Sequence, residues 1–211
     1  LATARCNTRY LPMAPFPESL RVESDLARAV GSAQELLIAV PSHGFRECLE
    51  HVAPLLRHGM RVAWATKGFE LDSGKLPHQV ANEVLGVAVP KAVLSGPTFA
   101  REVGLGLPTA MTVASRDQDY ALALARALSG QHFRAYASTD VIGVEVGGAT
   151  KNVLAIGAGI SDGLGFGANT RVALITRGLA EMMHLGVALG AEKYTFMGLA
   201  GLGDLVLTCT D

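Results

Sequence analysis

Short aliphatic runs alternate with longer amphipathic stretches along the first two thirds of the chain. Runs of four or five apolar residues are typical of buried strands, and apolar residues three and four apart indicate helices. We predict strands over Leu36–Val40, Arg61–Ala65, Lys91–Leu94, Ala110–Ala114 and Phe133–Tyr136. We predict helices over Ser24–Val30 (with Ser24 as N-cap), Phe45–His58, Lys75–Leu85 and Asp117–Leu128. This alternation favours an α/β fold with a doubly wound, largely parallel sheet.

The alternation stops near Asp140. Beyond it, segments rich in glycine and alanine have helical apolar spacing, and no strand-like run interrupts them. We predict helices over Val141–Gly159 and Thr170–Leu189, and a third that opens near Asp204. The chain therefore divides into an α/β domain, residues 1–139, and the start of an all-helical domain, residues 140–211. No linker rich in proline or serine separates them, so we expect the two parts to pack closely.

Composition narrows the classes of function. The chain has 211 residues, 49% of them hydrophobic, and a formal net charge of −1 with scattered basic residues. This balance disfavours nucleic acid or an anionic membrane surface as partner and favours a small-molecule ligand. The longest apolar run, Val153–Ile160, is too short to span a membrane. The three cysteines and six histidines have no metal-ligand spacing, so we expect reduced thiols, no metal and a cytoplasmic protein.

Three loops follow the expected strands at their carboxyl ends. They are Pro41–Gly44, Thr66–Glu70 and Ser95–Ala100, all rich in small or polar residues. Tight turns need such residues anyway, so each loop taken singly favours a purely structural interpretation. Three of them at one sheet edge favour a ligand site, because ligands of open α/β sheets bind there. Lys67 adds a cation that can reach an anionic ligand.

Two glycine-rich motifs lie in the second part. The sequence "GLGFGA" (Gly163–Ala168) has a relaxed dinucleotide-binding pattern, but it follows a helical segment and not a strand. We interpret it as a turn between helices, with Asn169 as the cap of the next helix. The sequence "GLAGLGDL" (Gly198–Leu205) places Asp204 at a helix start. From spacing alone, a capping or first-turn acid is the favoured role for Asp204.

Lys151 stands among small and apolar residues in "GVEVGGATKN". On a helix, its neighbours one turn away are Gly147, Gly148, Leu154 and Ala155. Lysine is almost never fully buried unless it is paired. Two interpretations stay open: a stem that lies on apolar surface with its ammonium in water, or a general acid–base in a glycine-lined cavity. In the second case, loss of water and a nearby cation such as the lysine of "ATKG" would favour proton release.

Several longer motifs together resemble one enzyme family. In order, they are "CNTRYLP", "AVPSH", "ATKG", "SGPTFA", "GVEVGGATKN", "GISDGLGFGANTRVALITRGL" and "FMGLAGLGDLVLTCTD". They closely resemble bacterial NAD(P)-dependent glycerol-3-phosphate dehydrogenase over almost the whole chain. The resemblance implies a Rossmann-type domain followed by a helical domain. It also implies NAD- or NADP-dependent interconversion of dihydroxyacetone phosphate and sn-glycerol 3-phosphate for phospholipid synthesis, and it leaves a homodimer open.

The resemblance also implies roles for individual residues. Lys151 falls on the family's catalytic lysine, the general acid–base, which also contacts the substrate. The other matched positions bind ligands: the substrate at Gly96, Thr98, Asn152 and Asp204, the cofactor at Ala100, and both at Lys67.

The sequence departs from the family pattern at both ends. The family's glycine-rich pyrophosphate loop would precede Leu1, and its Ser-Arg-Asn stretch would follow Asp211. We therefore expect an internal fragment with little activity of its own. One alternative is an enzyme of the β-hydroxyacid dehydrogenase type, but that type has asparagine four residues after the lysine, where this chain has Ala155. The other is a non-catalytic metabolite-binding protein on the same scaffold.

Overall fold

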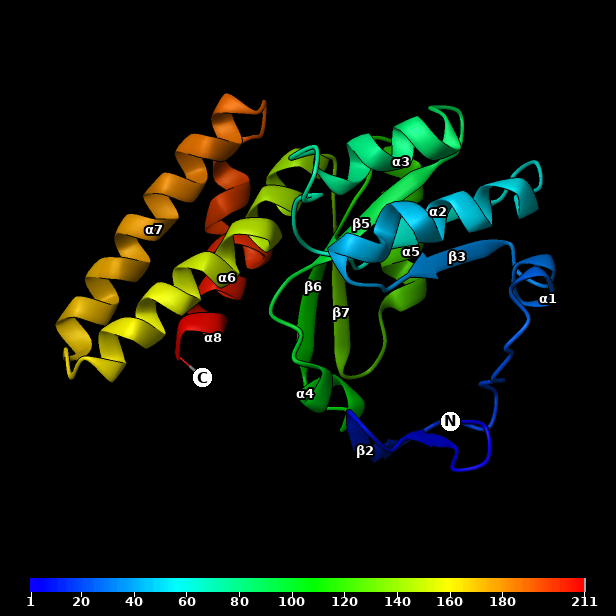
Figure 1. The fold of residues 1–211 in the computed structure, drawn as a ribbon, viewed down its shortest axis with the longest axis horizontal. Helices are drawn as coiled ribbons and strands as arrows, with labels where there is room; N and C mark the ends of the chain where they lie inside the picture. Colours follow the sequence, from blue (N-terminus) through cyan, green and yellow to red (C-terminus); the bar gives the residue numbers. More distant parts are fainter. Residues whose placement is uncertain (211) are drawn as a thin grey trace.

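A five-stranded sheet forms the centre of the computed structural model, which describes residues 1–210 (Figure 1). The strands lie in the order β3-β4-β5-β6-β7. Their bounds are Glu35–Ile38, Arg61–Trp64, Lys91–Ser95, Thr109–Ala114 and Phe133–Ser138. The pairs β3–β4, β4–β5 and β6–β7 are parallel, and β5–β6 is antiparallel. The prediction of a largely parallel sheet is confirmed.

Helices cover both faces of this sheet. Helices α2 (Phe45–Val52) and α3 (Pro77–Leu85) lie on one face, and α5 (Gln118–Leu128) lies on the other (Figure 1). Successive residues of a strand point to opposite faces, and β4 shows the consequence. Trp64 packs in the core under α2 and α3, whereas Ala63 packs in the core under α5.

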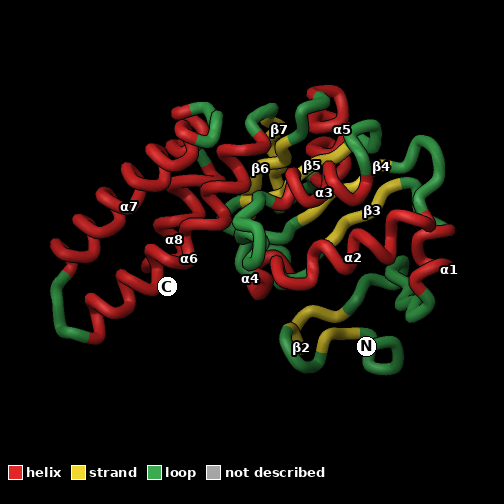
Figure 2. The backbone as a smooth tube through the Cα atoms, turned by 45° about the horizontal axis from the view of Figure 1, so that its top comes forward, coloured by secondary structure: helices red, strands yellow, loops and turns green. Residues whose placement is uncertain are grey.

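The chain after β7 is mostly helical (Figure 2). Helix α6 (Val141–Gly163) and α7 (Ala168–Ala188) pack side by side, and α8 (Asp204–Thr210) packs against α6. A 3-10 helix, Lys193–Met197, and a π-helical turn, Leu199–Gly203, connect α7 to α8. By length and composition α6 could span a membrane, but half of its apolar stretch is buried inside the protein, as in a core helix.

Several helix boundaries differ from the prediction. Helix α1 (Leu26–Gly31) is capped by Asp25, whose carboxylate accepts from the Arg28 amide, so Ser24 is not the cap. Helix α2 ends at Val52, because a 3-10 turn that contains a proline, Ala53–Leu55, follows it. Proline removes a helical N–H and therefore ends the ladder of α-helical hydrogen bonds.

The predicted cap of α7 is also wrong. Gly167 occupies the N-cap, without a side chain to cap it, and Asn169 lies in the first turn. The segment Gly163–Ala168 does connect α6 to α7, so its interpretation as a turn between helices is confirmed.

A small antiparallel hairpin near the N-terminus was not predicted. It pairs β1 (Cys6–Asn7) with β2 (Leu11–Pro15). The hairpin packs on α4 (Ala100–Gly104), where Leu11 and Ala14 of β2 lie against the backbone of Gly104.

Candidate active site

The loops after β3, β4 and β5 meet at the carboxyl edge of the sheet. Ser42 of the first loop lies so close to Gly68 of the second that a Cβ on this glycine would be 3.2 Å from the Ser42 Oγ. Helix α6 closes the same region from the other side. A Cβ on Gly148 would lie 3.0 Å from the Ser95 Oγ and 3.3 Å from the Lys67 Cδ. The predicted convergence of the three loops is confirmed.

One buried carboxylate holds both lysines of this region. The Lys151 Nζ donates to Asp204 Oδ1 at 2.5 Å, and the Lys67 Nζ donates to Asp204 Oδ2 at 2.7 Å. The Asp204 side chain is 1% exposed, that of Lys151 11% and that of Lys67 24%. Lys151 also donates to the Thr208 Oγ1 at 3.1 Å, and Lys67 donates to the Gly96 carbonyl at 3.2 Å. Asp204 of α8 therefore joins Lys67, in the loop after β4, and Lys151, on α6, into one hydrogen-bonded cluster.

The cluster carries more positive than negative charge. Burial lowers the pKa of Lys67, and the Lys151 ammonium lowers it further, while Asp204 opposes both effects. When both ammonium groups are protonated, one carboxylate neutralises only one of them. The remaining positive charge, at the partly exposed Lys67, favours an anionic ligand.

The glycines beside Lys151 have a packing role. A Cβ on Gly147 would lie 2.2 Å from the Ala200 carbonyl oxygen, so this glycine allows the π-helical turn to approach α6. Gly148 allows the stem of Lys67 to approach in the same way. Protein atoms thus fill the space above both glycines, and the expectation of a glycine-lined cavity around Lys151 is wrong at these two positions. The same approach brings Asp204, at the end of the turn, to Lys151.

The remaining predicted residues divide into two groups. Gly96 is buried, and its carbonyl also accepts from the Thr98 Oγ1 at 3.3 Å, so both belong to the cluster. Asn152 is exposed and lies about 100° further round α6 than Lys151. Ala100 is exposed at the first residue of α4. The structure does not bring Asn152 or Ala100 into the hydrogen-bonded cluster.

Two residues of this site were not singled out from the sequence, although Ser95 begins one of the three predicted loops. Thr208 stands one helical turn after Asp204, and that spacing could have identified it. Ser95 is buried, and its Oγ has no hydrogen-bond partner within residues 1–210. Such an orphaned hydroxyl is costly unless a ligand or water completes its hydrogen bonds.

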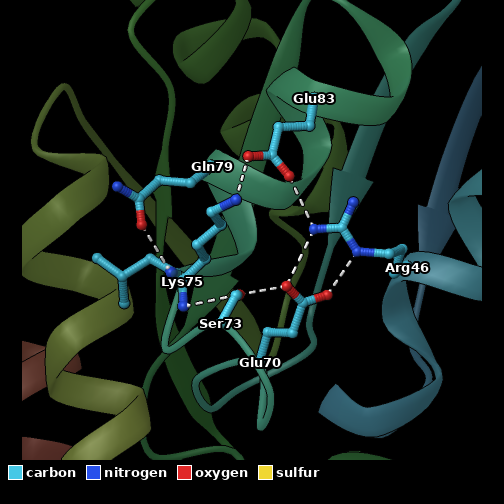
Figure 3. A network of polar contacts seen from close by, with 7 residues as sticks. Arg46, Glu70, Ser73, Lys75, Gln79 and Glu83 are labelled. Atoms are coloured by element: carbon cyan, nitrogen blue, oxygen red, sulfur yellow. Dashed lines mark hydrogen bonds and ion pairs between the residues drawn. The ribbon is translucent and has the colours of Figure 1, made fainter.

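A polar network supports the loop that carries Lys67 (Figure 3). Arg46 of α2 donates from Nε to Glu70 at 2.6 Å and from Nη2 to Glu83 of α3 at 2.8 Å. Lys75 also binds Glu83, and the Ser73 hydroxyl binds Glu70. Hydrogen bonds from Arg46 and Ser73 lower the pKa of Glu70 to about 2. The loop after β4 is therefore attached to both helices on its face of the sheet.

A doubly wound sheet whose carboxyl-edge loops face a helical part is the architecture of dinucleotide-dependent dehydrogenases. Residues 1–121 match the family described as NAD-dependent glycerol-3-phosphate dehydrogenase N-terminus, and residues 140–211 match the corresponding C-terminus. The chain belongs to the NAD-dependent glycerol-3-phosphate dehydrogenase family. This match decides between the two enzyme families that the sequence left open.

Individual relatives agree with the family match. The chain is 59% identical over 208 residues to the glycerol-3-phosphate dehydrogenases [NAD(P)+] of Shigella boydii and Escherichia coli, a match that covers 98% of this chain. It spans 61% of the length of these curated relatives. The crystal structure of glycerol-3-phosphate dehydrogenase from Coxiella burnetii is 48% identical, with a TM-score of 0.95. That comparison covers 100% of this chain and 64% of the Coxiella chain.

Proposed function

We propose that the protein interconverts dihydroxyacetone phosphate and sn-glycerol 3-phosphate, with NAD or NADP as the cofactor. The observation that carries this proposal is the pairing of Lys151 and Lys67 with the single buried carboxylate of Asp204. A general acid–base and a second cation stand together where a phosphorylated ketone would bind. The names of the close relatives support the same reaction.

Lys151 acts as the general acid–base. In the reducing direction its ammonium donates a proton to the carbonyl oxygen of the substrate, and it regains a proton from solvent afterwards. In the oxidising direction the neutral amine accepts the hydroxyl proton. A bound nicotinamide dinucleotide would supply the hydride to the central carbon in the reducing direction and would accept it in the oxidising direction. Asp204 orients Lys151 through the 2.5 Å hydrogen bond.

Lys67 contributes charge and position. Its ammonium is fixed by Asp204 and by the Gly96 carbonyl, yet it is more exposed than Lys151. It can therefore contact the substrate phosphate or the cofactor while Lys151 contacts the reacting oxygen. Gly96 and Thr98 bind the substrate from the loop after β5. Asn152, which is exposed on α6, would contact the substrate from outside the hydrogen-bonded cluster.

The residues present fit the cofactor. The buried Ser95 Oγ, which has no hydrogen-bond partner among residues 1–210, and the small side chains of the three loops are consistent with a flat polar ligand that approaches the backbone. Lys67 and the Ala100 backbone would bind the cofactor at the carboxyl edge of the sheet.

The protein's wider setting is part of the proposal. We assign residues 1–139 to a dinucleotide-binding domain and residues 140–211 to the start of a substrate domain. We place the enzyme in the cytoplasm, where it supplies glycerol 3-phosphate for phospholipids. Nucleic acid and membranes are not among the expected partners, and a homodimer is the assembly to test.

The experiment is dihydroxyacetone phosphate-dependent oxidation of NADH and NADPH by the protein as its gene encodes it. We expect Lys151→Ala to lower kcat by roughly 100-fold or more, with unchanged binding of the dinucleotide. Lys193→Ala, at an exposed lysine of the helical part, is the matched control and should retain full activity. A parent protein that binds the dinucleotide but reduces no dihydroxyacetone phosphate would support the non-catalytic alternative instead.

A further inference from the structure

A second buried carboxylate lies on α6, outside the lysine cluster. The Glu145 Oε1 accepts from the Trp64 Nε1 at 3.1 Å and from the His78 backbone amide at 2.9 Å. The Glu145 Oε2 lies 2.5 Å from the His78 Nδ1. The Glu145 side chain is 1% exposed and that of His78 10%. Both carboxylate oxygens are thus used by partners within the protein.

The partners of Glu145 belong to the part of the fold that carries Lys67. Trp64 is the last residue of β4, and Lys67 follows three positions later in the loop after that strand. His78 is near the start of α3. Glu145 itself belongs to α6, which carries Lys151 about 9 Å further along the helix axis. Glu145 therefore joins the two elements that deliver the lysine pair.

The contact constrains how α6 can sit on the sheet. Burial raises the pKa of Glu145, and the hydrogen bonds from His78 and Trp64 counteract that cost. A slide or rotation of α6 would leave the carboxylate buried without its donors, which costs far more than a displaced apolar contact. An apolar side chain at position 145 would fill the same volume but would tolerate several positions of the helix.

A cavity lies beside the partners of Glu145. A cavity of about 170 Å³ is lined by Trp64 and His78 and by the charged side chains of Lys91, Arg116 and Asp117. His78, one partner of Glu145, therefore borders this cavity, whereas Glu145 itself is not among the lining residues. Neither Lys67 nor Lys151 is among its lining residues.

We propose that Glu145 is a positioning residue that fixes the distance between Lys151 and Lys67 by fastening α6 to Trp64 and His78. The inference rests on the proposed function, because that distance matters for activity only if the two lysines act on one substrate. Glu145 does not touch the substrate; it acts through the helix that carries Lys151.

The first test compares Glu145→Ala with Glu145→Gln in the protein as its gene encodes it. Glutamine keeps an acceptor for the Trp64 and His78 N–H groups, whereas alanine removes every hydrogen bond. We expect Glu145→Ala to lower kcat for dihydroxyacetone phosphate reduction by roughly 10- to 100-fold, with little change in KM for the dinucleotide. Glu145→Gln should recover most of that kcat. Glu181→Ala, at an exposed glutamate of α7, is the control.

A second readout does not depend on turnover. An amine-reactive reagent modifies Lys67 and Lys151, and mass spectrometry measures the rate at each lysine. These rates report how often the lysines leave their hydrogen bonds to Asp204. We expect both lysines to react faster in Glu145→Ala than in the parent. Far-UV circular dichroism shows whether the variant is folded, because the fluorescence of Trp64 would respond directly to the loss of its hydrogen bond to Glu145. If Glu145→Ala does not fold, Trp64→Phe removes one donor, keeps an aromatic ring, and should give a smaller change in the same direction.

The outcomes separate the two proposals. Unchanged kcat and unchanged lysine reactivity in a folded Glu145→Ala protein would overturn the positioning role. A parent protein that reduces no dihydroxyacetone phosphate, together with faster lysine modification in the variant, would overturn the proposed function but support the positioning role.

Discussion

Lys151 and Asp204 are 53 positions apart in the chain, yet the lysine Nζ lies 2.5 Å from the aspartate Oδ1. The ammonium is buried beside small and apolar side chains, and this carboxylate offsets the cost of removing it from water. Asp204 does the same for Lys67, so it holds two cations that would otherwise repel each other. The cluster depends on Asp204 more than on either lysine.

Replacing Asp204 should therefore destabilise the fold as well as the site. Asp204→Ala leaves two lysines without their acid, and removal of one partner from a buried pair costs roughly 3–5 kcal/mol. Urea unfolding measures this loss. The control is Asp162→Ala, which breaks the half-exposed ion pair with Arg171 and should cost about 1 kcal/mol or less. Equal losses in the two variants would contradict the central role of Asp204.

The pH dependence of the free energy of unfolding should reveal the lowered pKa of Lys67. Its pKa lies below the ordinary value of 10.5 because of burial. At pH values between the lowered pKa of Lys67 in the folded protein and its ordinary pKa in the unfolded chain, the unfolded chain keeps a proton that the folded chain has released. The free energy of unfolding therefore rises with pH in that window. Lys67→Met should remove this rise, as measured by the free energy of unfolding at several alkaline pH values. Lys193→Met is the matched control, and an identical pH dependence in Lys67→Met and the parent would disprove the effect.

Acid should loosen the loop that carries Lys67. The pKa of Glu70 is lowered from 4.5 to about 2, so its contribution to stability is complete above 4.5 and is lost as the pH falls toward 2. Glu70→Gln should lose about 1 kcal/mol at neutral pH, since solvent screens this network. Its unfolding free energy should also vary less than that of the parent over the acid window. A parallel acid dependence in both proteins would argue against the network.

Two glycines of α6 should respond oppositely to alanine. A Cβ on Gly147 would collide with the Ala200 carbonyl oxygen, whereas a Cβ on Gly157 would meet no atom within 4 Å. Gly147→Ala should cost roughly 1–3 kcal/mol of stability through overpacking and should displace Asp204. Gly157→Ala should stabilise the protein by about 0.5–1 kcal/mol, the usual gain from replacing glycine within a helix. Thermal unfolding of both variants tests the contrast; stabilisation by both would refute close packing at Gly147.

Most of the sheet and the meeting of the three loops were predictable. The strands are short runs of aliphatic residues, and the carboxyl ends of parallel neighbours must share an edge. The hairpin of β1 and β2 was not predicted because the polar stretch "CNTRYLP" lacks apolar alternation. Hydrophobic pattern reports burial, and of the residues in these two short strands only Ala14 is buried.

The site was predictable in part, for a different reason. Local spacing placed Lys151 on a helix and Asp204 at a helix start, but no local pattern pairs residues so distant in sequence. The glycines were assigned to ligand space because a sequence does not show which backbone approaches them. Glu145 shows the same limit, since its carboxylate in an apolar run indicates a buried partner without identifying Trp64 or His78.

The antiparallel contact between β5 and β6 sets the direction from which Lys151 arrives. In this register, Ser95 pairs with Thr112 and Val93 with Ala114, so β6 descends from the loop edge toward the middle of the sheet. Strand β7 follows it, and the chain leaves the sheet at the far end. Helix α6 then runs in the opposite direction, passes Trp64 at Glu145 and reaches the three loops at Gly148. One reversed strand pair thus turns a helix that would have pointed away from the three loops into one that reaches them.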